Sequence, residues 1–169
     1  MSRLLRKFWF RVYLAASWFD GRLFRAIRKR ALEGATGRKC RGLFIDPTVR
    51  ITGVDNLMLG TNVSLHYWSY FGAEGGLSIG NDVAIGHFAN ILTTSHKFTD
   101  PIRPIKEQPL IFQPVTIGDN VWIGSNVTIL AGVEIGPRTV IAAGAVVRHS
   151  FPEGRVVIGG VPARILKAL

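Results

Sequence analysis

A six-residue spacing of aliphatic side chains runs through residues 116–147 and constrains the fold more than any other feature of the chain. The spaced positions all hold β-branched residues: Ile117, Ile123, Ile129, Ile135, Ile141 and Val147. A helix repeats near 3.6 residues and a strand near 2, so neither element alone explains a period of six. Six residues can form one flat side of a coil, made of a short strand and a corner. Three sides close a triangular turn of about 18 residues, which predicts a solenoid.

The same spacing extends over most of the chain. It starts less regularly at 43–59, and complete coils are predicted at 79–96, 117–134 and 135–152. Residues 97–114 break the period and contain four prolines, which cannot donate to a strand ladder. A long insertion in a compact solenoid is uncommon and is often functional.

Residues 1–42 differ from the repeat region 43–169 in charge. They contain 12 of the 21 Lys and Arg residues but only two acids, so the whole net charge of +10 lies in this segment. Aromatic and aliphatic residues are interspersed with the cations, and no helix breaker precedes Gly21. The pattern predicts a basic amphipathic segment of one or two helices in front of the repeat domain.

This N-terminal segment is too often interrupted by charge to cross a membrane. Its longest uncharged run, residues 12–19, is far shorter than the roughly 20 residues that a spanning helix needs. Arg11 also interrupts the apolar stretch that a secretory signal requires. Two alternatives stay open, because a basic helix rich in Trp and Phe can lie in the interface of an anionic membrane, or pack on the solenoid or on a neighbouring subunit. We expect no active-site residue in this segment.

The repeats resemble those of the hexapeptide-repeat acyltransferases. The resemblance rests on the recurring [Ile/Leu/Val]-Gly-x-x-Val-x pattern, on Asn-Val-Trp-Ile-Gly at 120–124 and on Gly-Val-Pro-Ala-Arg at 160–164. It covers about residues 43–169 and is strongest to the branch of galactoside, maltose and polysaccharide O-acetyltransferases. The resemblance implies a mainly β fold, a left-handed parallel β-helix of about five coils with an extended loop at 97–114 and a short C-terminal tail. It also implies a homotrimer with active sites between adjacent subunits, and acetyl-CoA as co-substrate.

His96 is the expected catalytic base. It ends the sequence Thr94-Ser95-His96, which falls where the family carries its catalytic histidine. A neutral imidazole can take the proton of an acceptor hydroxyl while the oxygen attacks the acetyl thioester. Direct transfer of this kind needs no acyl-enzyme intermediate.

Three residues are expected to contact the acceptor. His66 falls where sugar acetyltransferases have an acceptor-contacting asparagine, so a galactoside-like acceptor is in doubt. Trp68 offers a face on which a sugar can stack, and Glu74 falls where the family often has an acid in the acceptor pocket. As ordinary corner residues, all three would instead be structural.

Seven residues match family positions that contact coenzyme A. Those along the pantetheine arm are Trp122, Ser125 and Ala143. Those at the basic end, where cations suit the phosphates, are Arg148, His149, Arg164 and Lys167. No metal site is expected, because zinc-bearing relatives use a His-x4-His pair and the four histidines of this chain have no such spacing.

The favoured function is acetyl-CoA-dependent O-acetylation of a sugar hydroxyl, in the biosynthesis of a cell-surface polysaccharide or lipopolysaccharide. The alternative is N-acylation of an amino sugar, a sugar nucleotide or an antibiotic, and a non-enzymatic interaction scaffold is a third reading. The repeat region has no net charge, which argues against nucleic acid as a partner. A single cysteine rules out an internal disulfide framework. We expect a cytoplasmic protein, at the inner face of the cell membrane if the N-terminal segment binds lipid.

Overall fold

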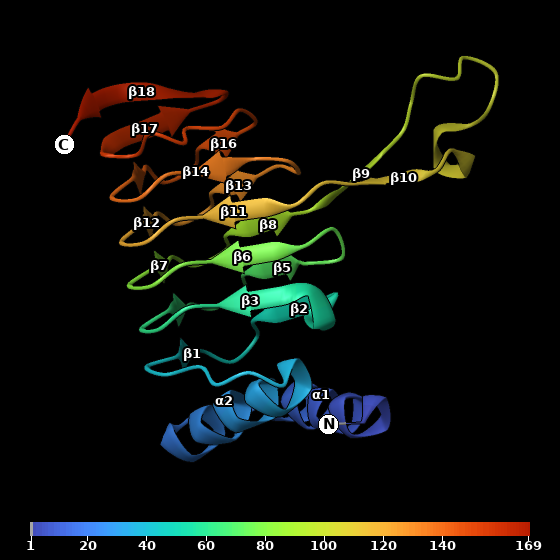
Figure 1. Ribbon diagram of the computed structural model, residues 1–169, viewed down its shortest axis with the longest axis vertical. Helices are drawn as coiled ribbons and strands as arrows, with labels where there is room; N and C mark the ends of the chain where they lie inside the picture. The colour runs from blue at the N-terminus through green and yellow to red at the C-terminus, as the bar shows by residue number, and fades with distance from the viewer. Residues whose placement is uncertain (1) are drawn as a thin grey trace.

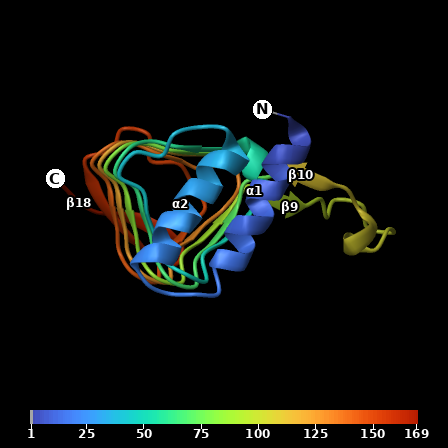
Figure 2. The same cartoon turned by 90° about the horizontal axis from the view of Figure 1, so that it is seen from below.

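The computed structural model describes residues 2–169, which form a triangular parallel β-helix with two helices across its N-terminal end (Figures 1 and 2). Each of the three sides is a sheet of short strands. The first sheet contains β1 (Phe44–Ile45), β4 (Ser64–Leu65), β7 (Ala84–Ile85), β12 (Trp122–Ile123), β15 (Val140–Ile141), β17 (Val156–Gly160) and β18 (Ala163–Ala168). The second contains β2 (Arg50–Thr52), β5 (Tyr70–Gly72), β8 (Asn90–Leu92), β13 (Thr128–Ile129) and β16 (Val146–Val147). The third contains β3 (Leu57–Leu59), β6 (Leu77–Ile79), β11 (Val115–Ile117) and β14 (Glu134–Ile135).

The six-residue spacing corresponds to ladders of buried side chains inside the triangle. Strands β1, β4, β7, β12 and β15 of the first sheet are parallel and in register. The second residue of each strand therefore lies directly above the second residue of the strand in the coil below. The residues in this ladder, each fully buried, are Ile45, Leu65, Ile85, Ile123 and Ile141. Burying such a ladder is the main source of stability in a solenoid whose coils touch only their neighbours. The coils wind in the left-handed sense that the resemblance implies.

The number of coils is six rather than about five. The first sheet holds six parallel strands, and the last of them, β17, begins an incomplete sixth coil. The short C-terminal tail forms a strand, because β18 turns back and pairs antiparallel with β17. The turn at Val161–Pro162 reverses the chain instead of releasing it, so a hairpin covers the top of the β-helix (Figure 1).

An arm leaves the β-helix after β8. Strands β9 (Thr94–His96) and β10 (Leu110–Phe112) pair antiparallel, and residues 97–109 extend beyond them (Figure 1). The buried Gln108 holds the tip together, since its Nε2 donates to the carbonyls of Asp100 and Arg103, both at 2.9 Å. A 3-10 turn, Ile105–Glu107, lies in the same tip. The arm is therefore an ordered structure rather than an irregular loop.

Helices α1 (Arg3–Ala16) and α2 (Arg22–Thr36) lie across the base of the triangle (Figure 2). Their inner side chains Tyr13, Ala31 and Leu32 are fully buried and belong to the same core cluster as the first coil. Tyr13 also donates its hydroxyl to the carbonyl of Val49 at 2.8 Å, and burial raises the pKa of Tyr13. Of the two alternatives left open for this segment, packing on the solenoid is therefore observed for its inner face.

Arg28 of α2 ties both helices to the first coil, although its guanidinium is completely buried. It donates to the carbonyls of Ile45 at 3.1 Å, Ala16 at 3.0 Å and Phe19 at 2.6 Å. These three carbonyls belong to the first strand, the end of α1 and the connection between the helices. A single side chain thus satisfies backbone groups from three segments, which fixes how the helices sit on the β-helix.

Arg28→Met should lower the free energy of unfolding by about 2–4 kcal/mol. Methionine fills much of the same space but leaves buried carbonyls without donors, and each unsatisfied group costs about 1–3 kcal/mol. The matched control is Arg30→Met, because Arg30 is on the same helix but is exposed and makes only a 3.7 Å ion pair with Glu33. Chemical unfolding of both variants at equal protein concentration measures the difference. Equal midpoints for the two variants would contradict the assigned role of Arg28.

Candidate active site

The turns that follow the strands of the first sheet stack into one row along the edge of the β-helix. We call it the first-corner row, and it consists of residues 46–48, 66–68, 86–88, 124–126 and 142–144. The third residue of every turn has a positive φ, between 58° and 73°. These residues are Thr48, Trp68, Phe88, Asn126 and Gly144. Because all five turns share one backbone shape, their side chains form parallel columns.

The upper part of the row, in the coils of β12 and β15, is lined with small residues. Ser125 and Ala143 occupy equivalent positions there, and Gly124 lies against the backbone of the coil above. A Cβ on Gly124 would lie 2.6 Å from the amide nitrogen of Ala143, so only glycine fits between these turns. Trp122 projects from the neighbouring strand with 60% of its surface exposed. A strip of small residues beside an exposed indole suits an extended, flexible ligand, and we refer to this strip as the channel.

The basic residues predicted for coenzyme A separate into two places. Arg164 and Lys167 lie on β18, at the top of the same sheet that carries Trp122. Arg148 and His149 directly follow β16, so they lie at the corner where the strands of the second sheet end. There the Nε of Arg148 donates to the Nε2 of His149 at 3.0 Å. The structure therefore brings Arg164 and Lys167 onto the sheet of the channel but leaves Arg148 and His149 at a different corner.

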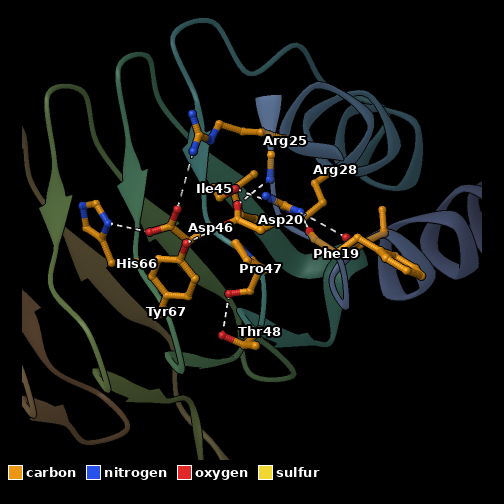
Figure 3. A network of polar contacts seen from close by, with 12 residues as sticks. Phe19, Asp20, Arg25, Arg28, Ile45, Asp46, Pro47, Thr48, His66 and Tyr67 are labelled. Atoms are coloured by element: carbon orange, nitrogen blue, oxygen red, sulfur yellow. Dashed lines mark hydrogen bonds and ion pairs between the residues drawn. The ribbon is translucent and has the colours of Figure 1, made fainter. Parts of the chain in front are cut away.

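The lower part of the row holds a polar cluster (Figure 3). His66 points its Nδ1 at the Oδ2 of Asp46, at 2.9 Å, and Asp46 is almost completely buried. Arg25 of α2 lies 4.0 Å from the other carboxylate oxygen and 4.1 Å above the ring of Phe44. The ring of His87, one coil higher, has its centroid 5.2 Å from that of His66. Of this cluster, only His66 was expected to belong to the site.

A hydrogen bond to a carboxylate also joins the connection between the helices to this row. Tyr67 donates its hydroxyl to the Oδ2 of Asp20 at 2.9 Å. The backbone amide of Gly21, and then the Tyr67 hydroxyl, lower the pKa of Asp20, and the same hydrogen bond raises the pKa of Tyr67. Residues 1–42 reach this row, because Asp20 contacts Tyr67 and Arg25 contacts Asp46.

His96 and Glu74 lie at the next corner of the triangle, which follows the strands of the second sheet. His96 ends β9, is exposed, and faces Leu110 across the ribbon of the arm. Thr93 fixes the base of this ribbon, since its hydroxyl donates to the carbonyl of Gly72 at 2.7 Å. Glu74 occupies the same corner one coil lower. Within one chain, the strands of the second sheet separate these two residues from the turn that holds His66 and Trp68.

The single cysteine of the chain is a further group that could take part in catalysis. Cys40 is buried, and this burial raises the pKa of its thiol, so it is not placed to act as a nucleophile. Within residues 2–169, no group of three or more His, Cys, Asp or Glu side chains could hold a metal ion. The described part of the chain also contains no helix that is long and apolar enough to span a membrane.

Known proteins share both the sequence pattern and the fold. Residues 114–149 match the bacterial transferase hexapeptide (six repeats) family model. The chain is 32% identical over 126 residues to galactoside O-acetyltransferase of Escherichia coli, covering 75% of this chain and 61% of that protein. It is 36% identical over 118 residues to the "Putative lipopolysaccharide biosynthesis O-acetyl transferase" of the same species, covering 66% of this chain and 60% of the relative. The chain thus spans about 60% of the length of these two relatives.

Longer matches extend over nearly the whole chain. A "Putative acetyltransferase" of Dictyostelium discoideum is 34% identical over 142 residues, which cover 83% of this chain and 70% of that protein. The structure of a galactoside acetyltransferase in complex with coenzyme A superposes with a TM-score of 0.84 at 27% identity, covering 98% of this chain and 80% of that chain. A hexapeptide-repeat acetyltransferase of Vibrio cholerae complexed with acetyl coenzyme A gives a TM-score of 0.79 at 29% identity, covering 98% of this chain and 87% of that chain. The chain therefore belongs to the hexapeptide-repeat acyltransferase family, within the branch that contains the galactoside O-acetyltransferases.

Proposed function

We propose that the protein transfers an acetyl group from acetyl-CoA to a sugar hydroxyl. The observation that carries this proposal is the first-corner row, which changes along its length from a polar cluster around His66 to a smooth channel at Ser125 and Ala143. The polar end suits a hydroxylated acceptor and the smooth end suits the pantetheine arm. The relatives named as O-acetyltransferases, and those solved with coenzyme A or acetyl-CoA, support the same reaction class.

The reaction needs one proton acceptor and a site for the developing oxyanion. The imidazole of His96 takes the proton of the acceptor hydroxyl, and the hydroxyl oxygen attacks the thioester carbonyl. A backbone N–H of a neighbouring coil stabilises the oxyanion. The C–S bond then breaks, and the thiolate of coenzyme A takes the proton from His96. The products are an O-acetyl ester and free coenzyme A.

The complete site requires two subunits, because His96 lies at a different corner from the first-corner row within one chain. The arm that carries His96 also exposes large apolar side chains: Phe98, Ile102, Ile105, Leu110, Ile111 and Phe112. Six exposed large apolar side chains on one arm indicate a contact with another protein surface. In a homotrimer, the arm of one subunit covers the first-corner row of the next and brings His96 to the acceptor, as the resemblance implies.

Subunit mixing tests this arrangement. A His96→Ala subunit keeps an intact channel, and an Ala143→Trp subunit keeps an intact His96, so each homotrimer should be inactive. Random mixed trimers should recover about one quarter of wild-type thiol release from acetyl-CoA, because one in four interfaces then combines two intact halves. The assay uses sugars and their amino-sugar analogues as acceptors, which also distinguishes O-acetylation from N-acylation. If mass spectrometry detects mixed trimers and the mixture is still inactive, the two-subunit site is contradicted.

The natural acceptor is proposed to be a membrane-associated polysaccharide or lipopolysaccharide precursor. The exposed side chains of the two helices and of their connection support this choice, and we call them together the base surface. Its exposed apolar side chains are Leu4, Phe8, Trp18, Phe19 and Leu23, and its exposed cations are Arg3, Lys7, Arg11 and Arg22. A surface of large apolar residues flanked by cations suits the interface of an anionic bilayer. We therefore place the protein at the inner face of the cell membrane, with the base surface toward the lipid.

A further inference from the structure

The hydrogen bond between Asp46 and His66 fixes which ring nitrogen carries the proton. The two side chains meet at 2.9 Å, with 5% of the Asp46 side chain and 31% of the His66 side chain exposed. A carboxylate can only accept hydrogen bonds, so Nδ1 of His66 must be the donor. The neutral ring then keeps its lone pair on Nε2. Figure 3 shows that this second nitrogen is directed away from Asp46 and out of the cluster.

Three of the polar groups around His66 pair with one another or with Asp46, and the fourth, His87, is exposed. Arg25 stands 4.0 Å from the second oxygen of Asp46 and is held against Phe44. Asp20 accepts from Tyr67 at 2.9 Å, and the His87 ring lies 5.2 Å from the His66 ring, one coil toward the channel. These are the titratable and charged groups that the helices and the neighbouring coils bring to His66. The Nε2 of His66 is therefore the ring nitrogen that the contact with Asp46 leaves open to a ligand.

We infer that the Nε2 of His66, oriented by Asp46, accepts a hydrogen bond from a second hydroxyl of the acceptor, beside the hydroxyl that is acetylated. The inference rests on the proposed function and deepens it. The reacting hydroxyl gives its proton to His96, so it cannot also donate to His66. The acceptor must carry two neighbouring hydroxyls, as a vicinal diol or a sugar ring with a free hydroxyl next to the acetylation site does. Asp46 is a positioning residue in this scheme, because it acts through His66.

The tautomer of His66 is the first test. In the full-length protein labelled with ¹⁵N-histidine, long-range ¹H–¹⁵N correlation spectra should show His66 with its proton on Nδ1. In Asp46→Asn, the donor groups of Arg25 hold the amide oxygen on their side and the NH2 group turns toward His66. The NH2 group then donates to Nδ1 and the ring proton moves to Nε2, the exchange that the same substitution produces in a Ser-His-Asp triad.

Asp82→Asn is the matched control. Asp82 is also a corner aspartate and accepts from the Nδ2 of Asn62 at 2.8 Å, but it lies at a different corner of the triangle. This variant should leave the His66 spectrum unchanged. A wild-type His66 that carries its proton on Nε2 overturns the inference, whatever the kinetics show.

The second test compares two simple acceptors with acetyl-CoA, cis-1,2-cyclohexanediol and cyclohexanol. The wild-type protein should prefer the diol. Asp46→Asn should lower kcat/KM for the diol by about 10- to 100-fold, the range for leaving a hydrogen-bonding group without its partner. Its effect on kcat/KM for cyclohexanol should be several-fold smaller, because this alcohol has no second hydroxyl to donate to His66. Thermal unfolding shows whether the variant keeps the wild-type fold.

A double-mutant cycle separates the positioning role from a general structural effect. In a His66→Asn protein, the further change Asp46→Asn should alter kcat/KM for the diol less than twofold, because Asp46 has lost the group through which it acts. Equal losses on both alcohols, or a full effect of Asp46→Asn without His66, would overturn the inference but not the O-acetyltransferase function. Failure of the protein to bind acetyl-CoA would contradict the proposed function. The tautomer measurement does not depend on acetyl-CoA, so it would still test the role of Asp46.

Discussion

His96→Ala lowers kcat by about two to four orders of magnitude, the usual contribution of a general base, and leaves the Kd of acetyl-CoA nearly unchanged. The exposed imidazole on the arm is proposed to contact the acceptor hydroxyl rather than coenzyme A, so its loss should affect proton transfer rather than binding. Steady-state release of free thiol measures kcat, and isothermal titration with acetyl-CoA measures the Kd.

Ser95→Ala provides the control for this substitution. Ser95 precedes His96 on β9 and is also exposed, but adjacent side chains of a strand point to opposite faces. The control variant should keep at least half of the wild-type turnover. If His96→Ala retains more than a tenth of wild-type kcat, the proton is taken by another group, and His66 becomes the first residue to examine.

Removing four cations from the base surface should lower binding to anionic vesicles by about three orders of magnitude at physiological salt. The variant replaces Arg3, Lys7, Arg11 and Arg22 with glutamine, whose helix propensity is close to that of arginine and lysine. Each cation near an anionic surface contributes about 1 kcal/mol, and every 1.4 kcal/mol is about tenfold in binding. Co-sedimentation with phosphatidylserine–phosphatidylcholine vesicles measures the loss, and pure phosphatidylcholine vesicles measure the apolar contribution alone.

The control for this prediction removes the same number of charges elsewhere. Lys97, Arg103, Lys106 and Arg138 are all exposed and lie on the arm and the third corner of the β-helix. Their replacement by glutamine should change vesicle binding far less, although the net charge falls equally. Equal losses in the two variants, or no binding by the wild-type protein, would show that the base surface faces something other than lipid.

The parts of the fold that follow from local spacing could be predicted from the sequence. The period of six places residues such as Ile123 and Ile141 in the interior by itself, because each coil repeats the same strand and corner. The last coil could not be predicted in this way. The spacing ends before β17, whose place in the sheet depends on its register with β15 and on the return of β18. The pairing of β17 with β15 and β18 therefore has no six-residue signal in β17 or β18.

The same distinction applies to the site. His66 could be chosen from its position in the repeat, but its partner Asp46 lies 20 residues earlier, and Arg25 comes from a helix with no repeat at all. One signal was present in the sequence. The pairs Ile45-Asp46 and Leu65-His66 occupy equivalent positions in consecutive coils, so stacking the coils would have brought the two polar side chains together. The docking of α2, which brings Arg25 to the carboxylate, depends on the buried contacts of Arg28 and has no such local signal.

The stacking of the turns in the first-corner row makes the β-helix a molecular ruler. Neighbouring parallel strands lie about 4.8 Å apart, so the turn of His66 and the turn of Ser125, two coils higher, are separated by roughly 10 Å along the axis. This separation can change only in whole steps, by the gain or loss of an entire coil, because a shorter insertion would throw the inner ladder out of register. A change in acceptor size must therefore be accommodated by the side chains of the lower turns or by the arm, whose length is free of the six-residue period.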